Sequence, residues 1–325
     1  MIIDFEHHIW TEEQLAKAGG RPGKTLRSWA SDGRMRLEMA LDYSRVEKHL
    51  EFMDQAGIDI SVLTIHASRV LDDIRKSNDF VARVVKENPK RFVGFAAALP
   101  AAGEPGLHEV ERAVNDLGMK GVQIYSQTDG HYLDSRELWP FYKRVSKLGV
   151  PIDVHVNSEP TGFEALHAPY PLYYVVAREF DQCAATLRLC LGGVLEEFPE
   201  LTFVVGHFAG GISSIKDRID QYMGYVGQNI PDFYLGKKLI SKPWNDYFHK
   251  LYISLAGRGV GVASLKGALT NISPEKLILG TDWPSNFEDD PQGVRQYIEA
   301  IRKLPITQSE ADDILGGNAA SILGI

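Results

Sequence analysis

The residues with the clearest chemical potential lie at the start of the chain, in the run Ile2–His8. Two isoleucines lead directly into a carboxylate and two imidazoles, a pattern typical of a buried strand that ends in a polar site. Alternate side chains of a strand share a face, so Glu6 and His8 are predicted to point one way and Phe5 and His7 the other. One face therefore offers two potential metal ligands, while His7 is expected in the core or behind them. Alternatively, Glu6 and His8 could lie at a solvated strand end. A metal site would need further ligands from elsewhere in the chain.

Comparable side chains follow other apolar runs along the chain. They are His66, Tyr125, His155, His207 and Asp282, each at the end of a predicted strand. Such a set of imidazoles and carboxylates could form one metal site if the strand ends meet at one edge of the fold. Two imidazoles and two carboxylates suit Zn²⁺ or Mn²⁺ with positions open for water or substrate, and the carboxylates slightly favour the harder ion.

The elements that must position these residues alternate between strand and helix. Eight strands are predicted, at residues 2–8, 60–64, 92–98, 121–125, 151–155, 201–206, 251–255 and 276–280. Several are continuous apolar runs, which indicates a parallel sheet covered on both faces. No Gly-x-Gly-x-x-Gly follows the first strand, so the sequence predicts an α/β fold of the (β/α)₈ TIM-barrel type rather than an open doubly wound sheet. In such a barrel the carboxyl ends of all strands form one rim, where the candidate ligands would meet.

The chain is predicted to form a single domain over residues 1–325. An excursion at about residues 11–39 is polar and rich in Gly, Lys and Arg, and it is expected to pack over the active-site rim. The sequence has 44% hydrophobic residues, 24% charged residues and a net charge of -8, which disfavours broad contact with nucleic acid or anionic membranes. Cys183 and Cys190 are expected to be reduced core thiols. With no secretory or membrane-spanning pattern in view, the cytoplasm is the expected location.

Several motifs carry a family resemblance through their order and spacing. They are Ile3–His8, Met53–Asp59, Asn88–Phe92, Gly206–Gly211, Gly280–Pro284 and Gly317–Gly324. Through them the chain resembles the amidohydrolase superfamily, over nearly its whole length. Within that superfamily it is most similar to the metal-dependent decarboxylases of aminocarboxymuconate semialdehyde, γ-resorcylate and 5-carboxyvanillate.

The resemblance implies a set of four ligands for one metal ion, namely Glu6, His8, His155 and Asp282. It also implies that His207 is an unligated catalytic histidine. Many superfamily members have His where Glu6 stands, whereas γ-resorcylate-type decarboxylases resemble this chain in using Glu. The strand that ends at Tyr125 does not end in lysine, which argues against a dinuclear site with a carbamylated lysine, and Lys120 before it is expected to be structural.

Each of the central residues also has a plain structural alternative. His155 could be a hydrogen-bonded core histidine, and His207 a helix-start histidine bonded to backbone. Asp282 could cap the helix that follows it. The position of each residue at the end of an apolar strand favours a role in the site, and His66 is a weaker candidate for the pocket.

The implied reaction is the non-oxidative decarboxylation of a small aromatic or conjugated unsaturated carboxylic acid. The metal ion would act as Lewis acid and template, and His207 or Asp282 would protonate the carbon that bears the carboxylate. Arg218 stands where the resembling decarboxylases carry a substrate-binding arginine. Three aromatic side chains could pack against a substrate ring: Tyr125, Phe208 and Trp283.

Other functions remain open at this point. The same metal could activate water, with His207 as base, in a hydrolase or hydratase of a small cyclic or unsaturated carboxylate. A barrel that only binds its ligand is a further alternative. Ser254 stands where many relatives show an acidic residue near the end of the seventh strand, which leaves substrate and reaction open. The resemblance also suggests a homodimer.

Overall fold

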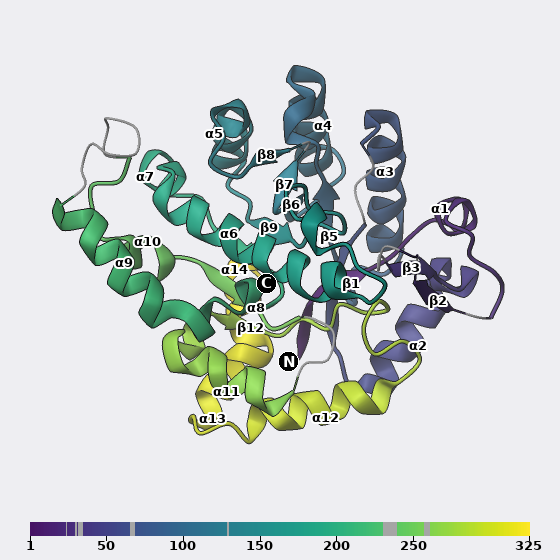
Figure 1. The fold of residues 1–325 in the computed structure, drawn as a ribbon. Coiled ribbons are helices and arrows are strands. Elements are labelled where there is room, and N and C mark those ends of the chain that lie inside the picture. Colours follow the sequence, from purple (N-terminus) through teal and green to yellow (C-terminus); the bar gives the residue numbers. More distant parts are fainter. Residues whose placement is uncertain are drawn as a thin grey trace.

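The computed structural model describes residues 1–325 except 24, 30, 32–34, 66–68, 129, 230–238 and 257–260. One sheet of eight strands runs in chain order: β1 (Ile3–His8), β4 (Ile60–Thr64), β5 (Phe92–Ala97), β6 (Gly121–Tyr125), β9 (Ile152–His155), β10 (Phe203–Val205), β11 (Tyr252–Ser254) and β12 (Leu277–Ile278). Neighbouring strands pair in parallel. Backbone bonds from Phe5 N to Leu279 O and from Asp282 N to Glu6 O bring the last strand against β1. The sheet therefore forms a nearly closed (β/α)₈ barrel, and the predicted fold class is confirmed (Figure 1).

Helices surround the strands (Figure 1). Those that separate or follow the strands are α2 (Val46–Ala56), α3 (Leu71–Glu87), α4 (Glu104–Asn115), α5 (Trp139–Leu148), α6 (Arg178–Leu191), α7 (Val194–Glu197), α8 (Phe208–Gly211), α9 (Lys216–Asn229), α10 (Trp244–Phe248), α11 (Val262–Asn271), α12 (Pro291–Arg302), α13 (Gln308–Asp312) and α14 (Asn318–Leu323). The single helix predicted over residues 179–198 is divided into α6 and α7, because Gly193 between them adopts a left-handed φ of 85°. Within the described residues, none of the helices has the length and apolar character needed to span a bilayer.

Apolar side chains fill the inside of the barrel below the site. The cluster contains Ile3, Phe5, Val62, Phe95, Val204 and Ile278 from the strands, and Ala319 and Leu323 from α14. The rings of Phe5 and Phe95 meet edge-on with centroids 5.4 Å apart. Burial of each large side chain contributes about 1.5–3 kcal/mol. This end of the barrel is an apolar floor covered by α14. The polar residues that form the site therefore lie at the opposite ends of the strands.

The side chains of β1 do not alternate strictly between the two faces of the sheet. Its pairing register with β4 shifts between Asp4 and His7. Phe5 packs inside the barrel, as Glu6 does, whereas the His7 ring lies 4.8 Å from the Trp283 ring. The prediction that Phe5 and His7 share a face is therefore wrong, because the irregularity resets the alternation between them.

The segment after β1 has secondary structure of its own. Thr11 starts α1 (Glu12–Lys17) with a capping box, and β2 (Leu26–Trp29) pairs antiparallel with β3 (Met35–Glu38). A second small ribbon, β7 (Gln127–Thr128) with β8 (His131–Tyr132), follows β6. Both segments contribute side chains to the pocket at the carboxyl ends of the strands.

Candidate active site

Ionisable side chains from the ends of β1, β9, β10 and β12 converge at the carboxyl end of the barrel. One ligand atom each of Glu6, His155, His207 and Asp282 lies within 4.8 Å of the other three. Glu6 Oε1 is 3.3 Å from His155 Nε2 and 3.5 Å from His207 Nε2. His8 joins the group, with its Nε2 3.0 Å from Asp282 Oδ1. Atoms bound at about 2.1 Å to a common ion lie about 3–4 Å apart, so this spacing fits one metal ion.

The remaining polar atoms of these ligands are held by neighbouring groups. The Ser254 hydroxyl donates to Glu6 Oε2 at 2.8 Å, and Thr64 Oγ1 lies 2.8 Å from His8 Nδ1. His155 Nδ1 donates to the carbonyl of the next residue at 2.9 Å, which leaves the lone pair of His155 on Nε2. No hydrogen-bond donor from the described part of the chain meets Glu6 Oε1. Outer contacts that fix the ligands while their inner atoms face one another are typical of a metal centre.

The ionisation of the cluster also suits a divalent cation. Burial opposes the charge of Glu6 and Asp282, but the neighbouring histidines outweigh it and lower the pKa of both carboxyls. Burial lowers the pKa of His155, so its ring is neutral near pH 7. Two carboxylates and the neutral imidazole of His155 form a donor set that neutralises and binds a divalent ion.

His207 is held differently from His155. Its Nδ1 lies 3.4 Å from Glu179 Oε1 on α6, while its Nε2 faces Glu6. Burial alone would lower the pKa of His207, but the Glu179 and Glu6 carboxylates outweigh it and raise the pKa well above the ordinary value. The ring is therefore placed to carry a proton beside Glu6, and His207 itself is not among the described residues that line the pocket.

The backbone at the two central turns adopts conformations that are rare for residues with a side chain. His207 and Phe208 have φ of 54°, Ala209 has φ of 51°, and Asp282 has φ of 56°. Each such residue costs about 1–3 kcal/mol and persists only where the surrounding structure imposes it. Such strain at both His207 and Asp282 is typical of a functional site.

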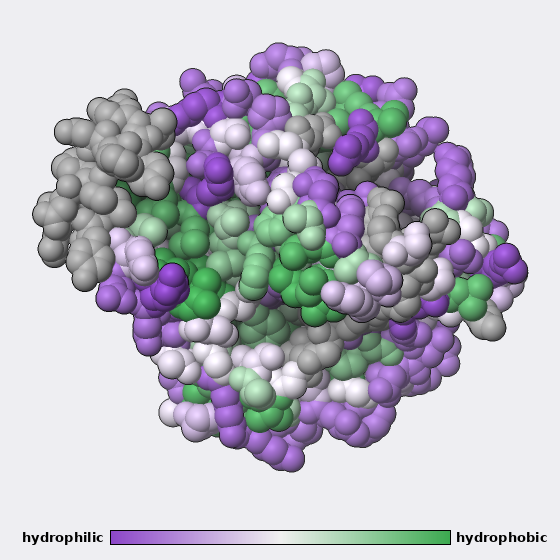
Figure 2. Space-filling view, in the orientation of Figure 1, coloured by the Kyte–Doolittle hydropathy of each residue, from purple (hydrophilic) through white to green (hydrophobic). Residues whose placement is uncertain are grey.

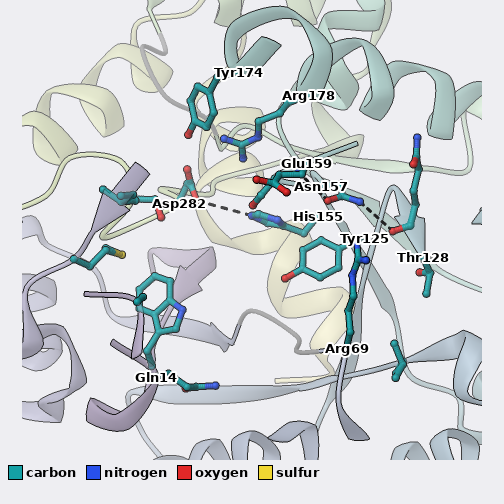
Figure 3. Close-up of a pocket in the computed structure, with 18 of the residues that line it drawn as sticks. Gln14, Arg69, Tyr125, Thr128, His155, Asn157, Glu159, Tyr174, Arg178 and Asp282 are labelled. Atoms are coloured by element: carbon teal, nitrogen blue, oxygen red, sulfur yellow. Dashed lines mark hydrogen bonds and ion pairs between the residues drawn. The ribbon is translucent and has the colours of Figure 1, made fainter. Parts of the chain in front are cut away.

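The cluster opens into a pocket of about 570 Å³. Its wall includes Trp10, Leu37, Arg69, Tyr125, Asn157, Glu159 and Arg178, and its inner end includes His155 and Asp282 (Figure 3). Tyr125 thus lies where a substrate-contacting aromatic was predicted, with its ring 5.9 Å from that of His155. The sequence analysis missed Arg178 and Glu179, which begin α6 directly after a π-helical turn, η5 (Tyr173–Ala177), that carries no distinctive sequence signal.

The structure does not bring the other predicted substrate contacts into this pocket. Trp283 is fully buried, stacked on Phe52 at 4.4 Å and flanked by Tyr43. Phe208 is half-buried against the hydrophobic core, and Arg218 is exposed on α9, where it stacks over a tyrosine. None of the three is among the described residues that line the pocket. The left-handed turn at Asp282 directs the next side chain, Trp283, out of the barrel, which corrects its predicted role.

His7 is buried away from the pocket, consistent with its expected place in the core. His49 Nε2 donates to a backbone carbonyl, so its Nδ1 must accept from His7 Nε2 at 3.0 Å. His7 Nδ1 lies 3.0 Å from Asp4 Oδ2, so the ring is held between Asp4 and His49. Lys120 is exposed, and His66 lies outside the described residues.

Curated relatives of known function align with most of the chain. The γ-resorcylate decarboxylase of Polaromonas sp. strain JS666 is 27% identical over 98% of this chain and 97% of its own. The 2-amino-3-carboxymuconate-6-semialdehyde decarboxylase of Dictyostelium discoideum is 28% identical over 90% and 80%. A 2-keto-4-carboxy-3-hexenedioate hydratase of Sphingobium sp. is 27% identical over 65% and 63%.

Solved structures share the fold. The 5-carboxyvanillate decarboxylase of Sphingomonas paucimobilis superposes with a TM-score of 0.80 at 22% identity, covering 100% of this chain and 99% of that one. A dihydroxybenzoic acid decarboxylase of Polaromonas sp. JS666, with bound manganese and the inhibitor 2-nitroresorcinol, gives 0.77 at 25% identity over 99% and 96%. The amidohydrolase family model Amidohydro_2 matches residues 3–325, and the chain belongs to this family.

Proposed function

We propose that the chain is a metal-dependent, non-oxidative decarboxylase, a carbon–carbon lyase that acts on a small aromatic or conjugated unsaturated carboxylic acid. The observation that carries the proposal is the buried cluster of Glu6, His155 and Asp282, with His207 beside it, at the inner end of a pocket. Two relatives named as decarboxylases, which align over nine-tenths of the chain or more, support the reaction type.

Four side chains are proposed to hold one Zn²⁺ or Mn²⁺ ion: Glu6, His8, His155 and Asp282. When bound, the ion supplies a Lewis acid that orients a substrate carboxylate and a neighbouring oxygen. A second set, with His207 in place of His8, is compatible with the distances, because His207 Nε2 is also close to Glu6 Oε1. The contact of His207 Nδ1 with the Glu179 carboxylate at 3.4 Å supports the first set, because that carboxylate favours a protonated ring, and the geometry of His8 beside Asp282 suits ligation.

His207 is proposed as the catalytic acid. Its Nε2 proton adds to the ring or alkene carbon that bears the carboxylate, using a π electron pair of the substrate. The bond from that carbon to the carboxylate then breaks, its electron pair restores the conjugated system, and CO₂ leaves. Solvent returns the proton to His207. Asp282 is the weaker candidate for this step, because its lowered pKa keeps it ionised.

The alternative is addition of metal-activated water to the substrate, in a hydratase or hydrolase. The relative named as a hydratase supports keeping this alternative. In that reaction His207 would have to be unprotonated to accept a proton from water, so the Glu179 carboxylate beside it favours the decarboxylase.

A CO₂-release screen tests the proposal. Purified protein loaded with Mn²⁺ or Zn²⁺ is incubated with hydroxybenzoates and unsaturated dicarboxylates, and evolved CO₂ and product mass are both measured. The proposal predicts products that have lost CO₂, with no release by chelator-treated protein. Products that keep every carbon and gain water would instead establish the hydratase alternative.

We also propose that the enzyme works as a homodimer in the cytoplasm on a small-molecule carboxylate. Exposed apolar side chains support a protein contact: Val175 in η5, Phe180 on α6, Ile215 in η6 (Ile212–Ile215) and Tyr222 on α9. Figure 2 shows apolar surface gathered where Figure 1 draws α6 and α8. Light scattering should give twice the chain mass, and Phe180→Glu should lower it. Cys183 and Cys190 are buried free thiols, which supports the proposed cytoplasmic location.

A further inference from the structure

The ends of β9 and β10 are joined by a side chain from α6, Gln182. This glutamine is fully buried, and its Nε2 donates to Val154 O at 2.7 Å and to Gly206 O at 3.4 Å. Val154 directly precedes His155, and Gly206 directly precedes His207. One amide group therefore bonds the backbone next to a proposed metal ligand and the backbone next to the proposed catalytic acid.

These bonds act on the direction in which each histidine leaves its strand. A carbonyl lies in the same planar peptide unit as the next nitrogen, so a bond to it fixes the plane from which the next residue starts. The pairing of β9 with β10 ends at Val154 and Val205, where Gly206 N still donates to Val154 O at 3.0 Å. Beyond that point the chain turns at His207 with φ of 54°. Gln182 thus connects the two strands where their own pairing stops.

The other end of the amide gives no support to the fold. No donor from the described part of the chain reaches Gln182 Oε1, although that atom is buried. The reverse orientation of the amide would place this oxygen against two carbonyl oxygens, which cannot donate a hydrogen bond. Both carbonyls keep another donor without Gln182, because Gly206 N bonds Val154 O and Ala209 N bonds Gly206 O at 2.9 Å. An apolar side chain of the same shape would therefore cost the fold little.

A second buried amide shows the arrangement that serves the fold alone. Asn78 on α3 donates to Ala97 O at the end of β5 at 3.2 Å and to Glu109 at 2.8 Å. Its Oδ1 accepts from Ala97 N at 2.9 Å. Both ends of this amide are bonded, and β5 carries none of the proposed ligands. Asn78 is therefore a matched control for Gln182.

We propose that Gln182 is a positioning residue that sets the separation of His155 and His207 around Glu6. The Nε2 atoms of these two histidines lie 3.3 Å and 3.5 Å from Glu6 Oε1, and their ring centroids are 5.3 Å apart. Glu179, on the same turn of α6, contacts His207 Nδ1. One turn of α6 thus holds both the backbone and the ring of the proposed acid. The inference rests on the proposed metal set, in which His155 is a ligand.

The test measures metal affinity and metal-free stability in the same variants. Gln182→Met keeps the shape of the side chain and removes the donor. Calorimetry with Co²⁺ should give a Kd about 10- to 100-fold higher than that of wild type, as for other outer contacts of metal ligands. The visible spectrum of bound Co²⁺ should also shift, because its ligands change position. The melting temperature of the chelated variant should stay the same or rise.

Asn78→Leu should behave in the opposite way, with a lower melting temperature and an unchanged Kd for Co²⁺. Gln182→Leu repeats the test if Gln182→Met does not fold. An unchanged Kd and Co²⁺ spectrum in the folded Gln182 variant would overturn the inference, whatever its melting temperature. If no acid releases CO₂, the decarboxylase fails but the Co²⁺ measurements still decide the role of Gln182. If wild type binds no Co²⁺, the proposed metal site and this inference both fail.

Discussion

Glu179 determines how His207 can act in this arrangement. Its carboxylate lies 3.4 Å from His207 Nδ1, and together with Glu6 it raises the pKa of His207 against the effect of burial. A metal ion bound to Glu6 would take up much of that carboxylate's charge, which leaves Glu179 as the lasting partner of the imidazolium. We therefore treat Glu179 as a positioning residue for the proton donor.

Glu179→Gln should change the pH profile of turnover. If protonated His207 is the acid, the rate falls as pH rises through its pKa. Loss of the Glu179 charge lowers that pKa, so the fall should begin at lower pH, with substrate binding little changed. The profile of kcat against pH measures this, and Glu197→Gln, at an exposed glutamate on α7, is the control. An unshifted profile in Glu179→Gln would remove Glu179 from this role.

At the level of single elements, the turn after β10 places His207 by close contact with α6. Gly210 has φ of 65°, and a Cβ added to it would overlap the Glu179 carbonyl. Gly211 has φ of 72° but no atom within 4 Å of such a Cβ. The two glycines thus share a left-handed backbone, and only the first is also in tight contact with a neighbouring helix.

Gly210→Ala should destabilise the protein more than Gly211→Ala. The left-handed backbone costs an alanine about 1–2 kcal/mol at either position. Overlap with α6 adds to this only at Gly210, and it should also displace His207 and reduce turnover. Thermal unfolding and activity of the two variants measure the difference. Equal melting temperatures with full activity in both would show that the turn adapts without cost.

The strand ends of the site are predictable from sequence for a physical reason. In a parallel barrel every strand delivers its last residue to one rim, so a polar residue after an apolar run has a known destination. Glu6, His155 and Asp282 were located in this way, and the structure brings them together. The position of Trp283 could not be predicted in this way. The φ of 56° at Asp282 redirects the chain, and no periodic pattern encodes that turn. The place of Arg178 in the pocket wall could not be predicted either, because it depends on packing between elements that are distant in the sequence.

For the whole molecule, the core and the metal centre are largely separate. The barrel floor is apolar and closed by α14, while Glu6 and Asp282, toward the other ends of the strands, carry buried negative charge that a cation would balance. The fold should therefore survive without metal, but with lower stability.

Chelation should lower the melting temperature by several degrees while far-UV circular dichroism stays native. An ion present at about a thousandfold its Kd stabilises the folded state by about 4 kcal/mol. Mn²⁺ or Zn²⁺ should restore both the melting temperature and CO₂ release. Unfolding on chelation at 25 °C would mean that the metal is a structural requirement.

The most direct test of the metal centre and of its proposed catalytic acid measures both metal content and turnover in three variants. Elemental analysis should find His155→Ala and Asp282→Ala depleted of metal, because each removes a proposed ligand. His207→Asn should keep its metal and its affinity for an unreactive substrate analogue, yet lose about 10²- to 10⁴-fold in kcat as expected for loss of a catalytic acid. Metal loss from His207→Asn, with partial rescue of turnover at high metal concentration, would contradict the account and make His207 a ligand.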